Sequence, residues 1–214
     1  MKKINYDTEK YNFVTELQKL FKVNDLSMIH EQWSLARSYD LLDDIETDQY
    51  TVYHKHFYDY SQDTQWYEVY ALFLKDVIRP LFKEPILYQK IPTFRVHQPS
   101  NLAVAAFHKD SDYSHSVHEI NFFLPMTRAF GNNTVWVESR AGENDYLPIE
   151  STVGECVIWD GANLSHGNKV NDTGVSRVSV DFRVLPSSRY IENDKSSFTN
   201  KTRMILGEYY GMME

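Results

Sequence analysis

The sequence has little cysteine, few glycines and prolines, and no long apolar run. Its 214 residues include one cysteine, eight glycines and seven prolines. The single thiol, Cys156, excludes a disulfide within the chain and is typical of a reducing compartment. No run approaches the roughly 20 apolar residues of a membrane-spanning helix, and the first residues lack the apolar segment of a signal peptide. These absences predict a soluble, cytoplasmic protein with no membrane partner.

Positive charge is also scarce. Lysine and arginine total 22 against 30 aspartates and glutamates, which gives a formal net charge of −8. Nucleic-acid binding requires clustered positive charge, so we expect no nucleic-acid partner. Aromatic residues, in contrast, are abundant, with 15 tyrosines and 12 phenylalanines, and they indicate a core or pocket lined by large rings. The length suits a single domain, residues 1–214, with a core of its own.

Residues 1–84 show the apolar spacing of helices. The stripes are Phe13, Leu17, Leu20 and Phe21, and then Leu26, Ile29, Trp33 and Ala36. A third helical pattern, in residues 61–82, begins at Ser61 as a cap and is stopped by Pro80. Residues 49–60 are ambiguous, because their alternation is also compatible with an edge strand.

From residue 85 the period of the apolar residues becomes two. Short runs rich in β-branched and aromatic residues alternate with turn signals. These runs are residues 93–97, 102–108, 119–124, 133–139, 155–160 and 176–184. Six or more short strands at this spacing predict a sandwich or barrel. We predict an all-β jelly-roll core over residues 85–188, with the N-terminal helices on one face and residues 189–214 as a terminal helix or flap.

Histidine and aspartate are concentrated in residues 105–127. If residues 102–110 form a strand, His108 and Asp110 share one face and can share a metal ion. A third ligand must come from elsewhere, and His166 follows a turn 56 residues beyond Asp110. Two histidines and one carboxylate leave three corners of an octahedron open, which is the arrangement of non-haem iron(II) oxygenases. The same residues are also compatible with a polar strand end in solvent.

Residues 177–184 alternate between polar and apolar side chains. One face carries Arg177, Ser179, Asp181 and Arg183. If that face is solvated, the polar residues need no further role, and for Arg183 this interpretation stays open. Inside a barrel, Arg177 can hold a carboxylate bidentately and the Ser179 hydroxyl can add a hydrogen bond. A small dicarboxylate that chelates the metal at one end and meets Arg177 at the other would fill such a barrel.

These motifs resemble the iron(II)/2-oxoglutarate-dependent oxygenases, whose fold is a cupin-like double-stranded β-helix. The resemblance rests on His-x-Asp at residues 108–110, on His166, and on Arg-x-Ser at residues 177–179, and it extends over residues 90–186. The stretches "FHKDSDYSH", "EINFFLPMT", "VWVES" and "SHGNKVNDTGVSRVSVDFRV" are similar to the subgroup associated with aminoglycoside and orthosomycin antibiotic biosynthesis.

The resemblance implies a ligand set and a reaction class. His108, Asp110 and His166 would bind iron(II), and Arg177, helped by Ser179, would bind the distal carboxylate of 2-oxoglutarate. The enzyme would use O2 to oxidise a small soluble, sugar-like molecule, with release of succinate and carbon dioxide. Halogenating members lack the metal carboxylate, so Asp110 argues against halogenation. Hydroxylation, desaturation and oxidative cyclisation all remain open.

Other polar residues of the β region are candidates for further contacts. Asn121 has the inward parity of its strand and is expected to hydrogen-bond 2-oxoglutarate or substrate. Turn chemistry in residues 110–115 is expected to break the strand, and His115 and His118 are expected to lie outside the ligand set. Candidate substrate contacts are Arg95, Asp112, Trp136 and Glu138, each also compatible with a solvated strand or loop.

Two alternatives remain open at this stage. A cupin-type metalloenzyme would keep the metal, need no 2-oxoglutarate, and give Arg177 a structural role only. A non-catalytic jelly roll would bind carbohydrate or a partner protein through its aromatic and acidic strand faces, and the three metal ligands would be a coincidence.

Overall fold

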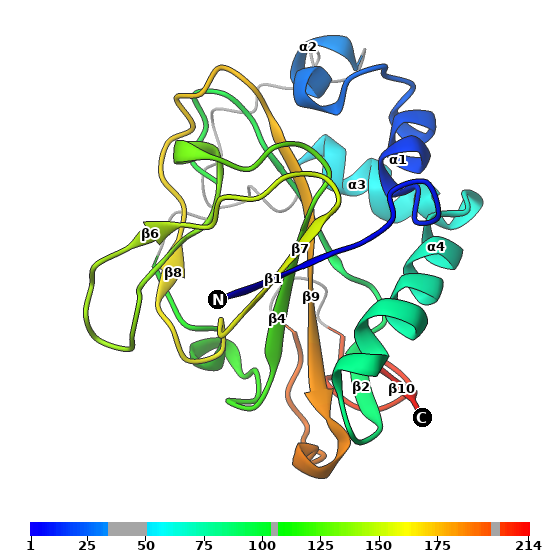
Figure 1. The fold of residues 1–214 in the computed structure, drawn as a ribbon, viewed down its shortest axis with the longest axis vertical. Helices are drawn as coiled ribbons and strands as arrows, with labels where there is room; N and C mark the ends of the chain where they lie inside the picture. The colour runs from blue at the N-terminus through cyan, green and yellow to red at the C-terminus, as the bar shows by residue number, and fades with distance from the viewer. Residues whose placement is uncertain (34–50, 104–106, 198–201) are drawn as a thin grey trace.

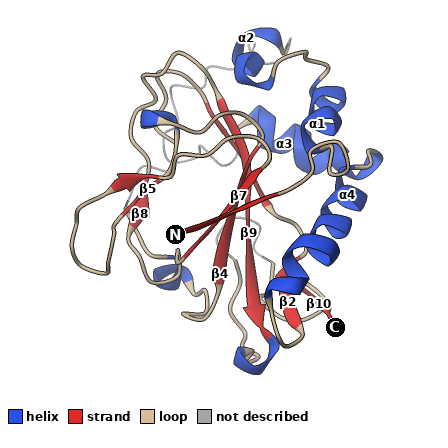
Figure 2. Cartoon of the chain, in the orientation of Figure 1, coloured by secondary structure: helices blue, strands red, loops and turns tan. Residues whose placement is uncertain are grey.

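After an N-terminal strand, Lys2–Asn5, which the apolar periods do not predict, helices come first along the chain and the other strands follow, as those periods predict (Figures 1 and 2). The computed structural model describes residues 1–33, 51–103, 107–197 and 202–214. The predicted stripe residue Ala36 lies outside the described residues. The helices are α1 (Phe13–Phe21), α2 (Ile29–Gln32), α3 (Val52–Tyr60) and α4 (Trp66–Phe73). Within the described residues, no helix is long and apolar enough to cross a membrane.

The helix α4 and its continuation occupy most of the third helical pattern. Ser61 starts a short 3-10 turn, Ser61–Asp63, and α4 itself begins at Trp66. A π-helical turn and the 3-10 turn Arg79–Leu81, which contains Pro80, follow directly. The α-helix itself ends at Phe73, and the helical turns that continue it end at Leu81, one residue after the predicted Pro80.

The interpretation of residues 49–60 as an edge strand is wrong, because most of this segment is helix α3. Tyr53 and Phe57 are four residues apart and fully buried, so one turn of helix directs both into the core. The Phe57 ring stacks on Phe94 with a centroid distance of 4.3 Å. Tertiary packing of these aromatic rings decides in favour of a helix where the local pattern is ambiguous.

The strands form two antiparallel sheets. The larger sheet has the order β1-β7-β4-β9-β2-β10, with β3 also paired to β9, and the smaller has the order β6-β5-β8. The bounds are β1 (Lys2–Asn5), β2 (Ile86–Gln89), β3 (Thr93–His97), β4 (Ile120–Pro125), β5 (Trp136–Val137), β6 (Leu147–Pro148), β7 (Glu155–Trp159), β8 (His166–Gly167), β9 (Arg177–Pro186) and β10 (Tyr210–Met213). This all-β core with helices on one side confirms the predicted fold class.

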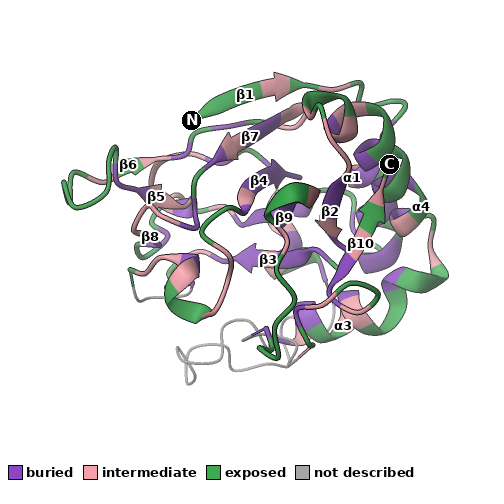
Figure 3. Cartoon of the chain, turned by 90° about the horizontal axis from the view of Figure 1, so that it is seen from below, coloured by how far each residue is buried: buried purple, intermediate pink, exposed green. Residues whose placement is uncertain are grey.

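Strand β9 lies between the helices and the cavity of the β core. Its apolar face, Val178, Val180, Phe182 and Val184, packs into the same hydrophobic core as helices α1, α3 and α4. Its polar face is also buried, and β3, β4 and β9 appear as the buried centre of Figure 3. Arg183 is only 7% exposed, so the solvated interpretation of this face is wrong.

Two local predictions differ from the structure. Residues 102–110 do not form a regular strand in their described part, since His108 makes one isolated bridge and Asp110 begins the 3-10 turn Asp110–Tyr113. The Asp112 carboxylate accepts the backbone N–H of Lys109 and so stabilises this turn. At the C-terminus, Tyr210–Met213 form strand β10, which pairs with β2 and extends the sheet where a terminal helix was one of the possibilities.

Candidate metal centre

Backbone pairing brings His108 and His166 together. The N–H of each donates to the carbonyl of the other over 2.9 Å. His166 begins the two-residue strand β8, which pairs with β5 in the small sheet. The two imidazole rings lie with their centroids 4.5 Å apart. Residues 58 positions apart in the sequence are therefore neighbours at one end of the small sheet.

Asp110 completes a three-residue cluster. Its backbone N–H donates to the carbonyl of Gly161 over 2.9 Å, which fixes the turn that carries it. Its Oδ1 atom lies 3.8 Å from Nε2 of His108 and 3.6 Å from Nε2 of His166. Two atoms that each bind a metal at about 2.1 Å can be at most about 4.2 Å apart, so both separations fit one shared ion. A ligand atom from each of the three residues lies within 4.8 Å of the other two.

The other carboxylate oxygen of Asp110 is already occupied. Oδ2 accepts Nε–H of Arg183 over 2.9 Å and lies 2.9 Å from Nη2 of the same guanidinium. It also accepts Nδ2–H of Asn121 over 2.7 Å. These donors orient the carboxylate so that Oδ1 faces the two imidazoles. Asp110 is therefore arranged to bind a metal through one oxygen only.

The charges of the cluster suit metal binding. Burial alone would raise the pKa of Asp110, but the Arg183 guanidinium holds that pKa below its usual range, with a smaller contribution from His166. Burial lowers the pKa of His166 to about 4. Its Nδ1 lies 3.0 Å from the carbonyl of Leu164, and a proton held there leaves Nε2 as the ligand atom. At neutral pH the site thus presents an anionic oxygen and a neutral imidazole nitrogen.

Asn121 lies against Gly161 for a steric reason. A Cβ atom at residue 161 would come within 2.6 Å of the Asn121 Nδ2 atom, so only glycine lets the amide reach Asp110. The Asn121 Oδ1 atom is buried and makes no hydrogen bond within the described residues. Asn121 also lines the cavity beside the metal ligands. This acceptor is therefore available to a hydroxyl or water in the cavity.

That cavity extends from the metal ligands towards Arg177. It has a volume of about 40 Å³, and its lining includes His108, His166, Phe123 and Asn168. Arg177 does not line it but lies directly behind, since its guanidinium carbon is 5.8 Å from the centre of the Phe123 ring. Its Nη2 lies 3.4 Å from Oδ1 of Asn168. One layer of side chains separates this arginine from the cavity.

Arg177 is completely buried and held by its neighbours. Its Nε donates to the carbonyl of Asn133 over 2.9 Å, and Nη1 donates to Oγ of Ser179 over 2.6 Å. The predicted pair of Arg177 and Ser179 is thus in direct contact. Asn133 and Asn168 were not singled out from the sequence, because nothing in their local pattern places them near β9.

The four candidate substrate contacts lie in different places. Arg95 lines the cavity and its Nε donates to Oδ1 of Asp181 over 2.8 Å. Glu138 is buried, and its carboxylate accepts backbone N–H groups, including that of Ser165 over 2.6 Å, so it stabilises the loop before β8. The Nζ atom of Lys169 lies 3.2 Å from the centre of the Trp136 ring. The Asp112 carboxylate caps its own turn. The last three do not line this cavity, and their contact with substrate stays a prediction.

Glu119 is a site residue that sequence reasoning missed. It is 2% exposed and accepts Nδ1 of His115 over 2.7 Å, while the Tyr210 hydroxyl donates to its other oxygen. It also lies 3.8 Å from Nε of Arg183. Arg183 therefore lies between two buried carboxylates, Glu119 and the metal ligand Asp110. His115 and His118 are outside the three-residue cluster, as predicted.

The comparisons with known proteins agree with this geometry. The streptomycin biosynthesis protein StrG of Streptomyces griseus is 40% identical over 176 residues, which cover 77% of this chain and 78% of StrG. The apo form of the non-haem monooxygenase ThoJ has a TM-score of 0.52 at 13% identity, over 94% of this chain and 82% of ThoJ. The nickel complex of ThoJ has a TM-score of 0.50 at 15% identity, over 87% of this chain and 73% of ThoJ. No family profile matches the chain.

The fold confirms the predicted double-stranded β-helix and is similar to that of the non-haem monooxygenase ThoJ. His108, Asp110 and His166 lie close enough together to share one metal ion. The identity to StrG over more than three quarters of both chains shows that the chain belongs to the StrG family.

Proposed function

We propose that this protein is an iron(II)- and 2-oxoglutarate-dependent dioxygenase that oxidises a small polyhydroxylated metabolite. The observation that carries the proposal is the arrangement of Asp110, with Oδ1 facing the Nε2 atoms of His108 and His166 while Oδ2 is held by Arg183. Two imidazole nitrogens and one carboxylate oxygen on a single face form the donor set that non-haem iron(II) prefers. The three residues would hold the iron.

The cosubstrate would bind between the iron and Arg177. Its keto acid end would meet the metal, and its distal carboxylate would meet the Arg177 fork with the Ser179 hydroxyl beside it. Phe123 and Asn168 would have to move, since they lie between Arg177 and the cavity. When bound, iron(II) and 2-oxoglutarate supply the oxidation of an unactivated C–H bond by O2, with succinate and carbon dioxide as by-products.

The protein's own residues would position the reactants and exclude water. Arg183 and Asn121 keep Asp110 turned toward the imidazoles, and the Leu164 carbonyl keeps His166 in the tautomer that binds metal. Trp159, whose ring meets His166 edge-on at 4.7 Å, closes the cavity on one side. The aromatic and polar side chains that line the cavity would restrict which C–H bond of a substrate can approach the iron.

The proposed substrate class is an aminocyclitol or sugar of the kind used in antibiotic biosynthesis. This part of the proposal is supported by the 40% identity to a protein named for streptomycin biosynthesis. Asn121 Oδ1, without a partner in the described structure, offers an acceptor for a substrate hydroxyl at the cavity. Hydroxylation, desaturation and oxidative cyclisation share the same hydrogen abstraction, so the reaction type follows from which C–H bond the substrate presents.

The proposal is tested by cosubstrate binding and then by turnover. Anaerobic protein with iron(II) should develop a weak visible absorption band on addition of 2-oxoglutarate, and Arg177→Ala should lose the band while it still binds iron. Arg140→Ala, an exposed arginine on the β5–β6 connection, serves as the matched control. A panel of aminocyclitols and sugars is then scored by substrate-dependent succinate formation and product mass. Iron binding without any response to 2-oxoglutarate would refute the proposal and favour a cupin-type enzyme.

A further inference from the structure

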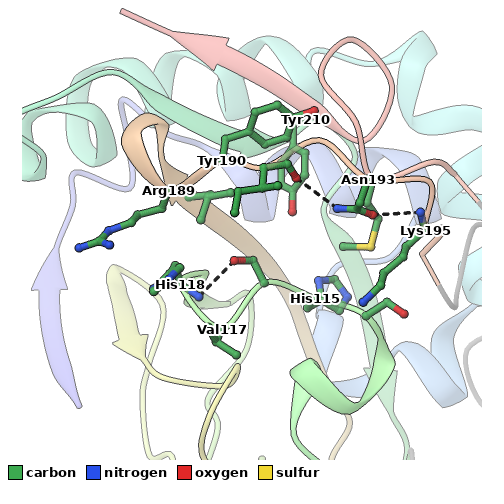
Figure 4. A pocket seen from close by; sticks show the side chains of 13 residues that line it. His115, Val117, His118, Arg189, Tyr190, Asn193, Lys195 and Tyr210 are labelled. Carbon is green, nitrogen blue, oxygen red and sulfur yellow. Dashed lines mark hydrogen bonds between the residues drawn. The ribbon is translucent and has the colours of Figure 1, made fainter.

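A second cavity lies beside the metal centre and shares no lining residue with the first. It has a volume of about 280 Å³. One wall is the loop of residues 114–118, as Figure 4 shows. The facing wall comes mainly from the segment after β9 and is formed by Leu185, Arg189, Tyr190, Ile191, Asn193 and Lys195; Glu192 and Asp194 of the same segment do not line the cavity. Glu119 and Arg183 separate it from Asp110, because His115 and Tyr210 of the cavity both contact Glu119. The two cavities therefore lie on opposite sides of one buried charge network.

The lining of this second cavity has an unusual charge for this protein. It includes His115, His118, Arg189 and Lys195, and none of its lining residues is acidic. The chain as a whole has a net charge of −8, and another surface cavity, of about 570 Å³, is lined by Glu16, Asp63 and Glu68. In this acidic protein, the Lys195 side chain of one wall extends toward His115 of the other, whereas the Arg189 side chain extends away from them (Figure 4). A cavity with this lining attracts an anion.

The wall that carries His115 is built in place rather than loosely exposed. The His115 side chain is 9% exposed, and its Nδ1 lies 2.7 Å from Oε2 of a Glu119 side chain that is fully buried. Because a proton at Nδ1 serves the carboxylate, the Nε2 edge of the ring is the one available to a ligand. Tyr210 binds the other Glu119 oxygen and so ties strand β10 to this wall.

The opposite wall is also held by specific hydrogen bonds. Oδ1 of Asn193 accepts the backbone N–H of Lys195 over 2.9 Å, which fixes the turn that presents the lysine (Figure 4). On the first wall, Oγ of Ser116 accepts the backbone N–H of His118 over 3.3 Å, so its hydroxyl hydrogen is available to a bound oxygen. Charged and neutral donors therefore both face the cavity.

We propose that this cavity binds the anionic group of a small metabolite, either a phosphate monoester or a carboxylate. Both are polyanionic or anionic oxygen groups that accept several charge-assisted hydrogen bonds from lysine, arginine and hydroxyl donors. The volume of about 280 Å³ is close to the lower end of the range for small-molecule sites. The proposal does not depend on the oxygenase activity, because the cavity shares no residue with the metal centre.

Binding is measured by calorimetry on the whole protein, without iron or 2-oxoglutarate. The probes are inorganic phosphate, glucose 6-phosphate, glucuronate and glucose. We expect the anionic sugars to bind more tightly than glucose, and the stronger of the two identifies phosphate or carboxylate as the preferred group. Binding should survive in His166→Ala, which removes a proposed metal ligand but leaves this cavity intact. Loss of binding in that variant would assign the anion to the metal centre and overturn the proposal.

Charge-removing variants locate the site. Lys195→Gln should weaken binding of the preferred anion roughly tenfold, as expected for one lost charge-assisted hydrogen bond. Arg189→Gln should have a smaller effect, because the Arg189 side chain extends away from His115 and Lys195. Lys75→Gln and Arg140→Gln remove exposed charges elsewhere and should change the affinity less than twofold. An effect of either control as large as that of Lys195→Gln would show only a general attraction to positive charge and would overturn the proposal. So would glucose binding as tightly as its anionic relatives, or no binding of any anion.

Discussion

Arg183 holds the oxygen of Asp110 that faces away from the two imidazoles. Its Nε and Nη2 atoms both lie 2.9 Å from Oδ2 of Asp110, and its Nε lies 3.8 Å from Oε2 of Glu119. The guanidinium is almost completely buried, so its charge is compensated by these carboxylates rather than by water. This single side chain therefore links the proposed metal centre to the network beside the second cavity.

Arg183→Gln should weaken both the fold and the metal site. Removing one partner of a buried charge cluster costs about 3–5 kcal/mol in the free energy of unfolding, because Asp110 and Glu119 lose their compensating charge. Loss of a group that orients a metal ligand should reduce iron(II) affinity by about 10- to 100-fold. Urea denaturation and anaerobic iron titration measure the two effects. The exposed Arg140→Gln is the control, and equal results for both variants would contradict this role of Arg183.

Substitution of any one of the three proposed ligands should abolish turnover, whereas substitution of a nearby histidine should leave iron binding unchanged. His108→Ala, Asp110→Ala and His166→Ala should each abolish turnover and lower iron(II) affinity by at least about 10-fold, since a three-ligand face that loses one member loses geometry as well as a bond. His118→Ala should keep wild-type iron affinity, because His118 is outside the cluster. Iron titration of the four folded variants tests this prediction. If the His166→Ala variant still bound iron and the His118→Ala variant did not, the proposed ligand set would be refuted.

Arg177→Lys should act on 2-oxoglutarate rather than on iron. Lysine keeps the charge but loses the bidentate fork, and one lost charge-assisted hydrogen bond is worth about 1.5–3 kcal/mol. The affinity for 2-oxoglutarate should therefore fall by about one to two orders of magnitude. The variant should also be less stable, because Arg177 Nε no longer reaches the Asn133 carbonyl. Unchanged 2-oxoglutarate affinity with the same loss of stability would make Arg177 a structural residue.

Gly161→Ala should disturb the metal centre through Asn121. The added Cβ would come within 2.6 Å of the Asn121 amide and force it from Asp110, at a cost of about 1–3 kcal/mol in the free energy of unfolding. Iron(II) affinity should fall as well, because Asp110 loses a donor to Oδ2. The matched test is the double variant with Asn121→Ala, in which the clash is absent and Gly161→Ala should add little further cost. Simple additivity of the two substitutions would contradict this explanation.

His54 should make the metal-free protein less stable in acid. Burial lowers the pKa of His54 to about 3, with Arg95 adding to the effect. Its unfolded pKa is near 6.5, so below that pH the unfolded state takes up a proton that the folded state does not. Stability is therefore full above pH 6.5 and falls as the pH drops towards 3, by up to about 1.4 kcal/mol per pH unit for this one group.

Urea denaturation between pH 7.5 and 4.5 tests this dependence. His54→Gln removes the titrating group, so its stability should fall less steeply with decreasing pH than that of the wild type, whatever its stability at pH 7.5. The comparison uses slopes, because Gln also loses the contact of the His54 ring with Thr51 Oγ1, at 2.7 Å. Identical slopes in the two proteins would show that His54 is protonated, or unprotonated, equally in both states.

The class of fold and the candidate site residues could be predicted from the amino-acid sequence alone. The change of apolar period near residue 85 separates the helices from the strands that follow them, and this signal is local because apolar side chains recur at a fixed spacing along each element. His108, Asp110, His166, Arg177 and Ser179 were identified by their spacing and residue type, and the structure brings the first three together.

The surroundings of these residues, in contrast, could not be predicted from the sequence, because they depend on contacts between distant segments. Alternation placed Arg183 on the polar face of β9 but could not show whether that face was solvated, because burial depends on strands distant in the sequence. Glu119, Gly161 and Asn168 carry no local signal, and each acquires its role from a partner at least nine residues away or from another loop. Helix α3 likewise follows from the packing of Phe57 on Phe94, a contact between two elements that no local period encodes.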